Sequence, residues 1–68
     1  MSPQQLLDEV QRLEDNGYVV FLKWDGERSK KKKTLVITKP GTDTFIRRDS
    51  DDMWQSLESA LMELHESD

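Results

Sequence analysis

The chain has 68 residues, of which 34% are hydrophobic and 35% are charged, and it contains no cysteine. This length predicts a single small domain, residues 1–68, with a thin hydrophobic core. The lack of cysteine excludes disulfides and thiolate metal sites. The net charge is −4, but residues 18–48 hold nine Lys or Arg and three acids, whereas residues 49–68 hold seven acids and no Lys or Arg. A basic middle therefore lies between acidic ends.

The first residues lack the basic region and apolar run of a secretory signal peptide. The longest apolar stretch, Val19 to Leu22, is too short to span a bilayer. We therefore expect a cytoplasmic protein that does not associate with membranes.

The N-terminal segment has the pattern of an amphipathic helix. Ser2 suits the N-cap, Pro3 the first helical position, and Gln5 the reciprocal position of a capping box. Asn16-Gly17 predicts the end of the helix, since Gly17 can adopt the left-handed conformation. The apolar face of this helix comprises Leu6, Leu7, Val10 and Leu13.

Three segments rich in β-branched and aromatic residues predict strands at Tyr18–Trp24, Thr34–Lys39 and Thr44–Arg48. The run Asp49–Asp52 then offers N-cap residues for a second helix. The apolar stripe of that helix comprises Met53, Trp54, Leu57, Ala60, Leu61 and Leu64. The predicted fold is α+β in the order α-β-β-β-α, with a three-stranded antiparallel sheet of order 1-2-3 and two helices packed on one face.

Hydrophobic matching sets the register of the two hairpins. A tight turn at Asp25-Gly26 would leave the second strand without apolar partners, so the first hairpin is centred on residues 28 and 29. This register pairs Leu22 with Leu35, and a turn at Gly41-Thr42 pairs Ile37 with Ile46. Asp25 to Lys33 then forms a long, mobile hairpin end.

The same registers divide the strands into two faces. The more apolar face, with Val20, Leu22, Trp24, Leu35, Ile37 and Ile46, is expected to receive both helices. The other face is expected to stay open, and its candidate partner-binding residues are Phe21, Lys23, Val36, Phe45 and Arg47. Aromatic rings beside cations can stack single-stranded nucleic acid, but an apolar patch with a polar rim favours contact with a protein partner or a second copy of the chain.

The lysine run supports the alternative hypothesis of nucleic-acid binding. Lys30, Lys31, Lys32 and Lys33 are expected near Arg47 and Arg48 at one end of the sheet, where they could hold phosphates. A solvated hairpin tip explains the same lysines without any ligand.

The order of the elements is similar to that of the double-stranded-RNA-binding domain. That family contacts RNA through its first inter-strand loop and a lysine-rich start of its second helix. The loop here is basic, but Asp49-Ser50-Asp51-Asp52 stands at the start of the second helix, where carboxylates would repel phosphates. No functional residue is therefore carried over, and we do not expect binding to double-stranded RNA.

Nothing in the sequence indicates catalysis. The single histidine, His65, lies in the last turn of the second helix, and no motif suggests an activated nucleophile. Helix capping explains Asp49, Asp51 and Asp52 better than weak binding of a divalent cation, and Trp24 and Trp54 are interpreted as core residues. We expect no catalytic residue, no metal and no cofactor. The favoured hypothesis is a small non-enzymatic interaction module that acts through its open sheet face.

Overall fold

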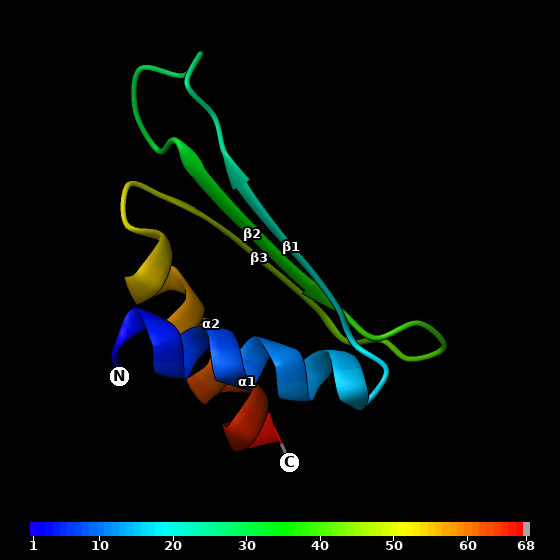
Figure 1. Ribbon diagram of the computed structural model, residues 1–68. Coiled ribbons are helices and arrows are strands. Elements are labelled where there is room, and N and C mark those ends of the chain that lie inside the picture. The colour runs from blue at the N-terminus through cyan, green and yellow to red at the C-terminus, as the bar shows by residue number, and fades with distance from the viewer. Residues whose placement is uncertain (68) are drawn as a thin grey trace.

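Helices flank the three strands at both ends of the chain, as predicted. The computed structural model describes residues 1–67. Its elements are α1 (Pro3–Asp15), β1 (Val19–Trp24), β2 (Lys33–Thr38), β3 (Phe45–Ser50) and α2 (Met53–Ser67). The strands form one antiparallel sheet of order β1-β2-β3, and both helices lie on the same side of it (Figure 1).

The predicted capping box starts α1. The hydroxyl of Ser2 accepts a hydrogen bond from the backbone N–H of Gln5 at 3.2 Å, and the side chain of Gln5 accepts one from the N–H of Ser2 at 2.8 Å. These bonds satisfy two N–H groups that would otherwise lack partners at the helix start. The helix stops before Gly17, which has a φ of +87°. Both ends of α1 are therefore encoded locally.

Only one residue of the acidic run caps α2. The carboxylate of Asp52 accepts from the N–H of Gln55 at 3.1 Å. Asp49 and Ser50 belong to β3 instead, because its pairing with β2 continues as far as Lys33 opposite Ser50. The prediction that Asp49 and Asp51 cap the helix is wrong. The ladder extends two residues beyond the expected end of the strand and takes in Asp49, while the carboxylate of Asp51 accepts the backbone N–H of Lys31.

The predicted registers of both hairpins are confirmed. Leu22 lies opposite Leu35 in the β1–β2 pair, and Ile37 lies opposite Ile46 in the β2–β3 pair. A slip by one residue would expose Leu35 and Ile37, whose side chains are completely buried. Hydrophobic matching was therefore the correct guide to the pairing.

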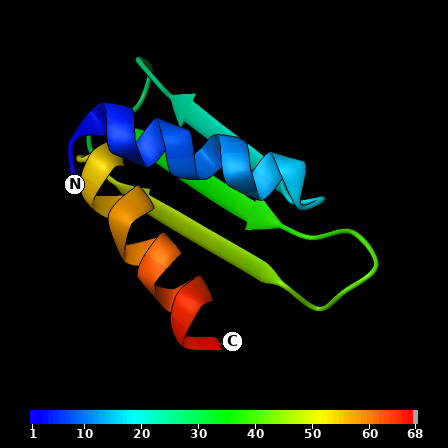
Figure 2. The ribbon, with the colours of Figure 1, turned by 60° about the horizontal axis from the view of Figure 1, so that its bottom comes forward.

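The core lies between the inner face of the sheet and the two helices. α1 lies along β1, and α2 lies over β2 and β3 (Figure 2). The buried hydrophobic residues are Leu6, Leu35, Ile37, Ile46, Met53, Leu57, Ala60, Leu61 and Leu64. Within residues 1–67, no helix is long and apolar enough to cross a membrane.

Trp24 departs from the predicted core. Its side chain is 53% exposed, although one edge of the ring contacts Trp54, with ring centroids 6.3 Å apart. Trp24 ends the edge strand β1, so no strand lies beyond it to complete its burial. Trp54 is half-buried and packs against the core as expected. The exposed indole therefore needs another explanation.

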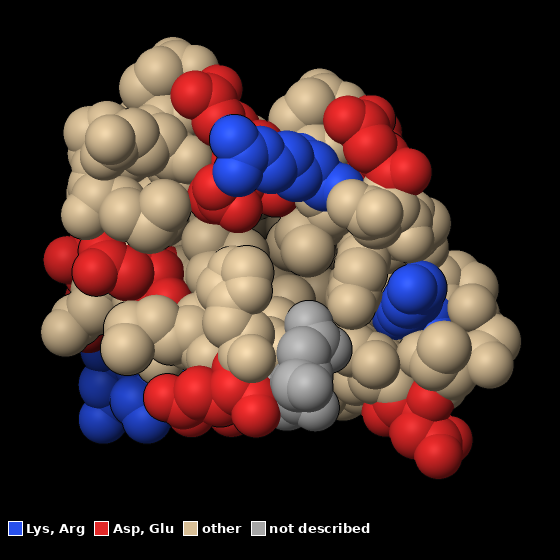
Figure 3. All heavy atoms as spheres, turned by 90° about the horizontal axis from the view of Figure 1, so that it is seen from below, with Lys and Arg blue, Asp and Glu red and all other residues tan. Residues whose placement is uncertain are grey.

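The two layers differ in charge. α1 carries four acids and one Arg, and α2 carries acids but no Lys or Arg. Viewed from the helix side, patches of Asp and Glu are spread over the surface and few basic side chains are visible (Figure 3). The Lys and Arg residues belong mainly to the sheet and its loops.

Candidate interaction surface

The outer face of the sheet, opposite the helices, is apolar and exposed. Val19 is 51% exposed, Phe21 53% and Phe45 65%. Val36 lies between them on the central strand, opposite Phe21 on one side and Arg47 on the other. Since neighbouring strands are about 5 Å apart, the strands that carry the two phenylalanines are roughly 10 Å apart. Phe45 is offset by two residues along β2, because it lies opposite Thr38. We call this set (Val19, Phe21, Val36 and Phe45) the open-face patch.

Cations stand beside the open-face patch, as predicted, but each is paired with an acid. Lys23 forms an ion pair with Asp25 at 3.4 Å, and the guanidinium of Arg47 contacts Asp49 at 3.1 Å. The five predicted partner-binding residues therefore do share one face. Their charges are partly neutralised within the chain itself.

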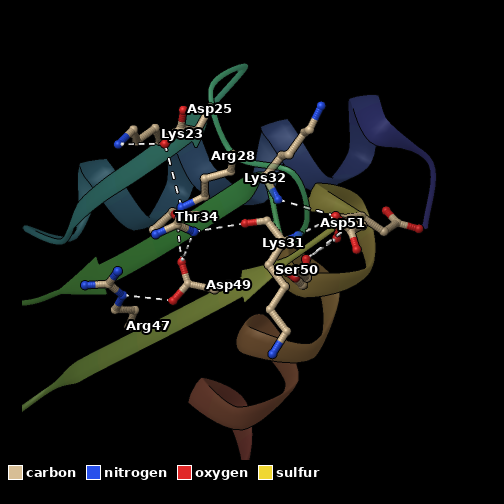
Figure 4. Close-up of polar contacts among 12 residues, drawn as sticks. Lys23, Asp25, Arg28, Lys31, Lys32, Thr34, Arg47, Asp49, Ser50 and Asp51 are labelled. Carbon is tan, nitrogen blue, oxygen red and sulfur yellow. Dashed lines mark hydrogen bonds and ion pairs between the residues drawn. The ribbon is translucent and has the colours of Figure 1, made fainter.

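Asp49 is the centre of the polar end of this face (Figure 4). Its Oδ1 accepts hydrogen bonds from the hydroxyl of Thr34 at 2.7 Å and from Arg28 at 3.2 Å, while Oδ2 accepts from Arg47. The hydrogen bond from Thr34, followed by that from Arg47, lowers the pKa of Asp49 from 3.8 to about 2. Asp49 is thus a fixed anion on β3 that ties this strand to the central strand β2 and to the first hairpin loop.

The hairpin loop of residues 25–32 is held by carboxylates rather than extending freely. Asp51 accepts the backbone N–H of Lys31 at 2.6 Å, and Arg28 donates to the carbonyl of Lys31 at 2.9 Å. Asp25 accepts the N–H of Glu27, and this bond is the largest cause of the lowered pKa of Asp25. Lys31 has a φ of +53°, a conformation that is strained for any residue with a Cβ. The loop is long, as predicted, and its contacts fix its path against the start of α2.

The structure brings the lysine run and the end of β3 to the same end of the sheet, but it separates the two arginines. Arg47 lies on the open face, whereas Arg48 lies on the helix side and contacts Glu63 at 2.8 Å. Within the described part of the chain, the ammonium groups of Lys30, Lys31, Lys32 and Lys33 form no ion pair. The cations therefore do not form one continuous basic patch, because Asp25, Asp49 and Asp51 lie among them.

Among residues 1–67, no group of His, Asp and Glu is arranged to hold a metal ion. Asp49, Asp51 and Asp52, which sequence reasoning had considered for a cation, each accept hydrogen bonds from different partners. His65 lies exposed in the last turn of α2, as predicted.

Sequence reasoning missed the role of Asp49. The signal was present in the register, because extending the Ile37–Ile46 pairing by three residues places Thr34 opposite Asp49. The hydroxyl and carboxylate then meet on the open face. We interpreted Asp49–Asp52 as a helix start from their local pattern, and we did not extend the pairing of the strands to Thr34 and Asp49.

Comparisons with known proteins found no match among family models, curated proteins or solved structures. The exposed face and its polar end are therefore the grounds on which a function can be argued.

Proposed function

We propose that this protein is a small non-enzymatic interaction module that binds a protein partner through the open-face patch. The observation that carries the proposal is the exposure of Phe21 and Phe45 on a face that neither helix covers. In a chain with so few apolar residues, two large rings outside the core favour a surface used for binding.

The size of the patch indicates the strength of the interaction. Burying the exposed half of two phenylalanines would remove about 200 Å² of apolar surface, which corresponds to about 5 kcal/mol before the costs of association. The paired charges of Lys23 with Asp25 and of Arg47 with Asp49 would form the polar rim. A modest, reversible affinity fits such a surface, and a second copy of the chain is one partner that would fit it. The proposal includes a cytoplasmic location, which imaging of the tagged chain would test.

Photo-cross-linking in cells tests the proposed face. A photoreactive residue at Phe45 should give one defined cross-linked product, and the change Phe21→Ser in the same chain should remove it. The matched control is Met62, which is 57% exposed but lies on α2. Identical products from positions 45 and 62 would contradict binding through the open face.

A nucleic-acid ligand remains the second candidate because the ammonium groups of Lys30–Lys33 are free of ion pairs within residues 1–67. Asp25, Asp49 and Asp51 stand close to these lysines and would weaken phosphate binding. Fluorescence anisotropy with labelled single- and double-stranded oligonucleotides at two salt concentrations separates the candidates. Binding that is tight at low salt and falls steeply as salt rises would favour nucleic acid. We expect no binding at physiological salt.

A further inference from the structure

The free edge of β1 carries unpaired backbone groups. Asp25 donates its N–H to the carbonyl of Lys32 at 2.8 Å, which continues the β1–β2 ladder. Because an antiparallel ladder alternates, Phe21 and Lys23 also direct their backbone groups toward β2. The N–H and C=O groups of Val20, Leu22 and Trp24 therefore point away from the sheet, and β1 forms its margin (Figure 2).

The other edge of the sheet is better protected against pairing. The bond from Lys39 N–H to Thr44 C=O sets the alternation of the β2–β3 ladder. In this alternation, the N–H and C=O groups of Phe45, Arg47 and Asp49 point away from β2 and toward solvent. Charged side chains on an edge discourage pairing with another strand, and β3 carries an Arg–Asp ion pair there. β1 carries only Lys23, so β1 is the edge that is open to another strand.

A hollow lies beside this edge. It measures about 420 Å³ and is lined in part by Leu7 and Val10 of α1 and by Val20 of β1. Leu7 is 41% exposed, although it belongs to the apolar stripe of α1. The same edge therefore presents an exposed indole, Trp24, at one end and, near the other end, a hollow whose apolar lining is accompanied by Gln11 and Glu14.

We infer that two copies of this chain pair through β1, antiparallel and about a twofold axis at Leu22, to form one continuous six-stranded sheet. This register places Leu22 opposite its own counterpart and Trp24 opposite Val20 of the second copy, so that each exposed indole reaches the hollow of the other copy. Such an interface is isologous and closes at two copies, because each copy offers both the projection and the hollow.

Neighbouring registers fit less well. An axis at Lys23 would set two ammonium groups directly opposite each other. An axis at Phe21 would place Trp24 opposite Tyr18, whose N–H is already bonded to the carbonyl of Leu13. The inference goes beyond the proposed function, since it concerns the edge of the sheet. In the open-face patch, Phe21 would lie beside the second copy, while Val36 and Phe45 on the other two strands would stay free for a partner.

Cysteine cross-linking tests the register cleanly, because the chain contains no cysteine of its own. An axis at Leu22 puts Phe21 of one copy opposite Lys23 of the other in a pair without backbone hydrogen bonds, where the side chains are close. We therefore expect a mixture of the Phe21→Cys and Lys23→Cys variants, one of them isotopically labelled, to form mainly mixed disulfide dimers in a glutathione buffer. The matched control is a mixture of Phe45→Cys and Arg47→Cys, which have the same spacing on β3.

Three outcomes would overturn the inference. The first is an excess of Phe21→Cys homodimers over mixed dimers. The second is a β3 control pair that forms as many mixed disulfides as the β1 pair. The third is a β1 pair that forms no more disulfide than the same mixture kept under reducing conditions. A second measurement tests the hollow: Leu7→Gln should raise the dissociation constant of the dimer at least tenfold in sedimentation equilibrium, whereas Met62→Ser should leave it unchanged. An unchanged constant for Leu7→Gln would also overturn the inference. Loss of the Phe45 photo-cross-link, by contrast, bears only on the proposed function.

Discussion

Replacing Ile37 with Ala should remove much of the stability of the domain, whereas replacing its neighbour Val36 should remove little. Ile37 is completely buried on the central strand, where it lies opposite Val20 and Ile46. Truncating such a residue costs about 2–4 kcal/mol, because it loses buried apolar surface and leaves a cavity. A domain of this length has a total stability of about 3–10 kcal/mol, so the loss is a large fraction of it.

Val36 is the neighbour of Ile37 on the central strand, and it occupies the opposite face of the sheet. Its side chain is half-buried on the open face, where no helix closes over it, so Val36→Ala should cost less than about 1 kcal/mol. Urea unfolding followed by circular dichroism measures both variants, and the midpoints should separate by roughly 1 M or more if the slope is about 1 kcal/mol per M. Equal losses, or a larger loss for Val36→Ala, would show that the two faces of the sheet have been assigned the wrong way round.

Three further predictions concern the polar end of the sheet. Asp49 has a folded pKa of about 2 against an ordinary value of 3.8, so it stabilises the fold above about pH 4 and loses this contribution as the pH falls toward 2. Between pH 4 and pH 2, the melting temperature should fall less for Asp49→Asn than for the wild type. An equal fall in the two proteins would rule out this role of Asp49. Lys31→Gly should raise stability by up to about 1 kcal/mol in urea titrations because it relieves the left-handed backbone; a loss would show that the strain is not there. Replacing Lys30–Lys33 together with Ser should leave the fold and self-association unchanged, and a variant that dissociates in light scattering would assign these lysines to an interface.

The elements and the sheet register could be predicted because they depend on local signals and on a strict alternation. The capping box of Ser2 and Gln5 and the left-handed Gly17 fix α1 within a few residues. The pairing of Leu22 with Leu35 follows from the need to bury both. These features can be read without three-dimensional information.

The polar end of the sheet could not be predicted in the same way. Asp49 resembled a helix cap because it begins a run of four polar residues directly before the second helix. Its actual partners, Thr34 and Arg28, are distant in sequence. Trp24 was taken for a core residue from its type, but burial at the end of an edge strand depends on what lies beside it. Both errors come from contacts between elements, which periodicity does not reveal.

The most direct test of an interaction surface on the open face compares the wild type with Phe21→Ser at low and high salt. Light scattering measures the average mass of each protein, and a thermal melt measures its melting midpoint. The wild type should increase in average mass with concentration, and more so at high salt, because each copy has a net charge of −4 and salt screens the repulsion. Phe21→Ser should not associate beyond the dimer that pairs through β1, and its melting midpoint should be nearly that of the wild type, since the ring is 53% exposed. A collapsed midpoint would show that Phe21 belongs to the core, and an association equal to that of the wild type would show that the open face does not mediate it.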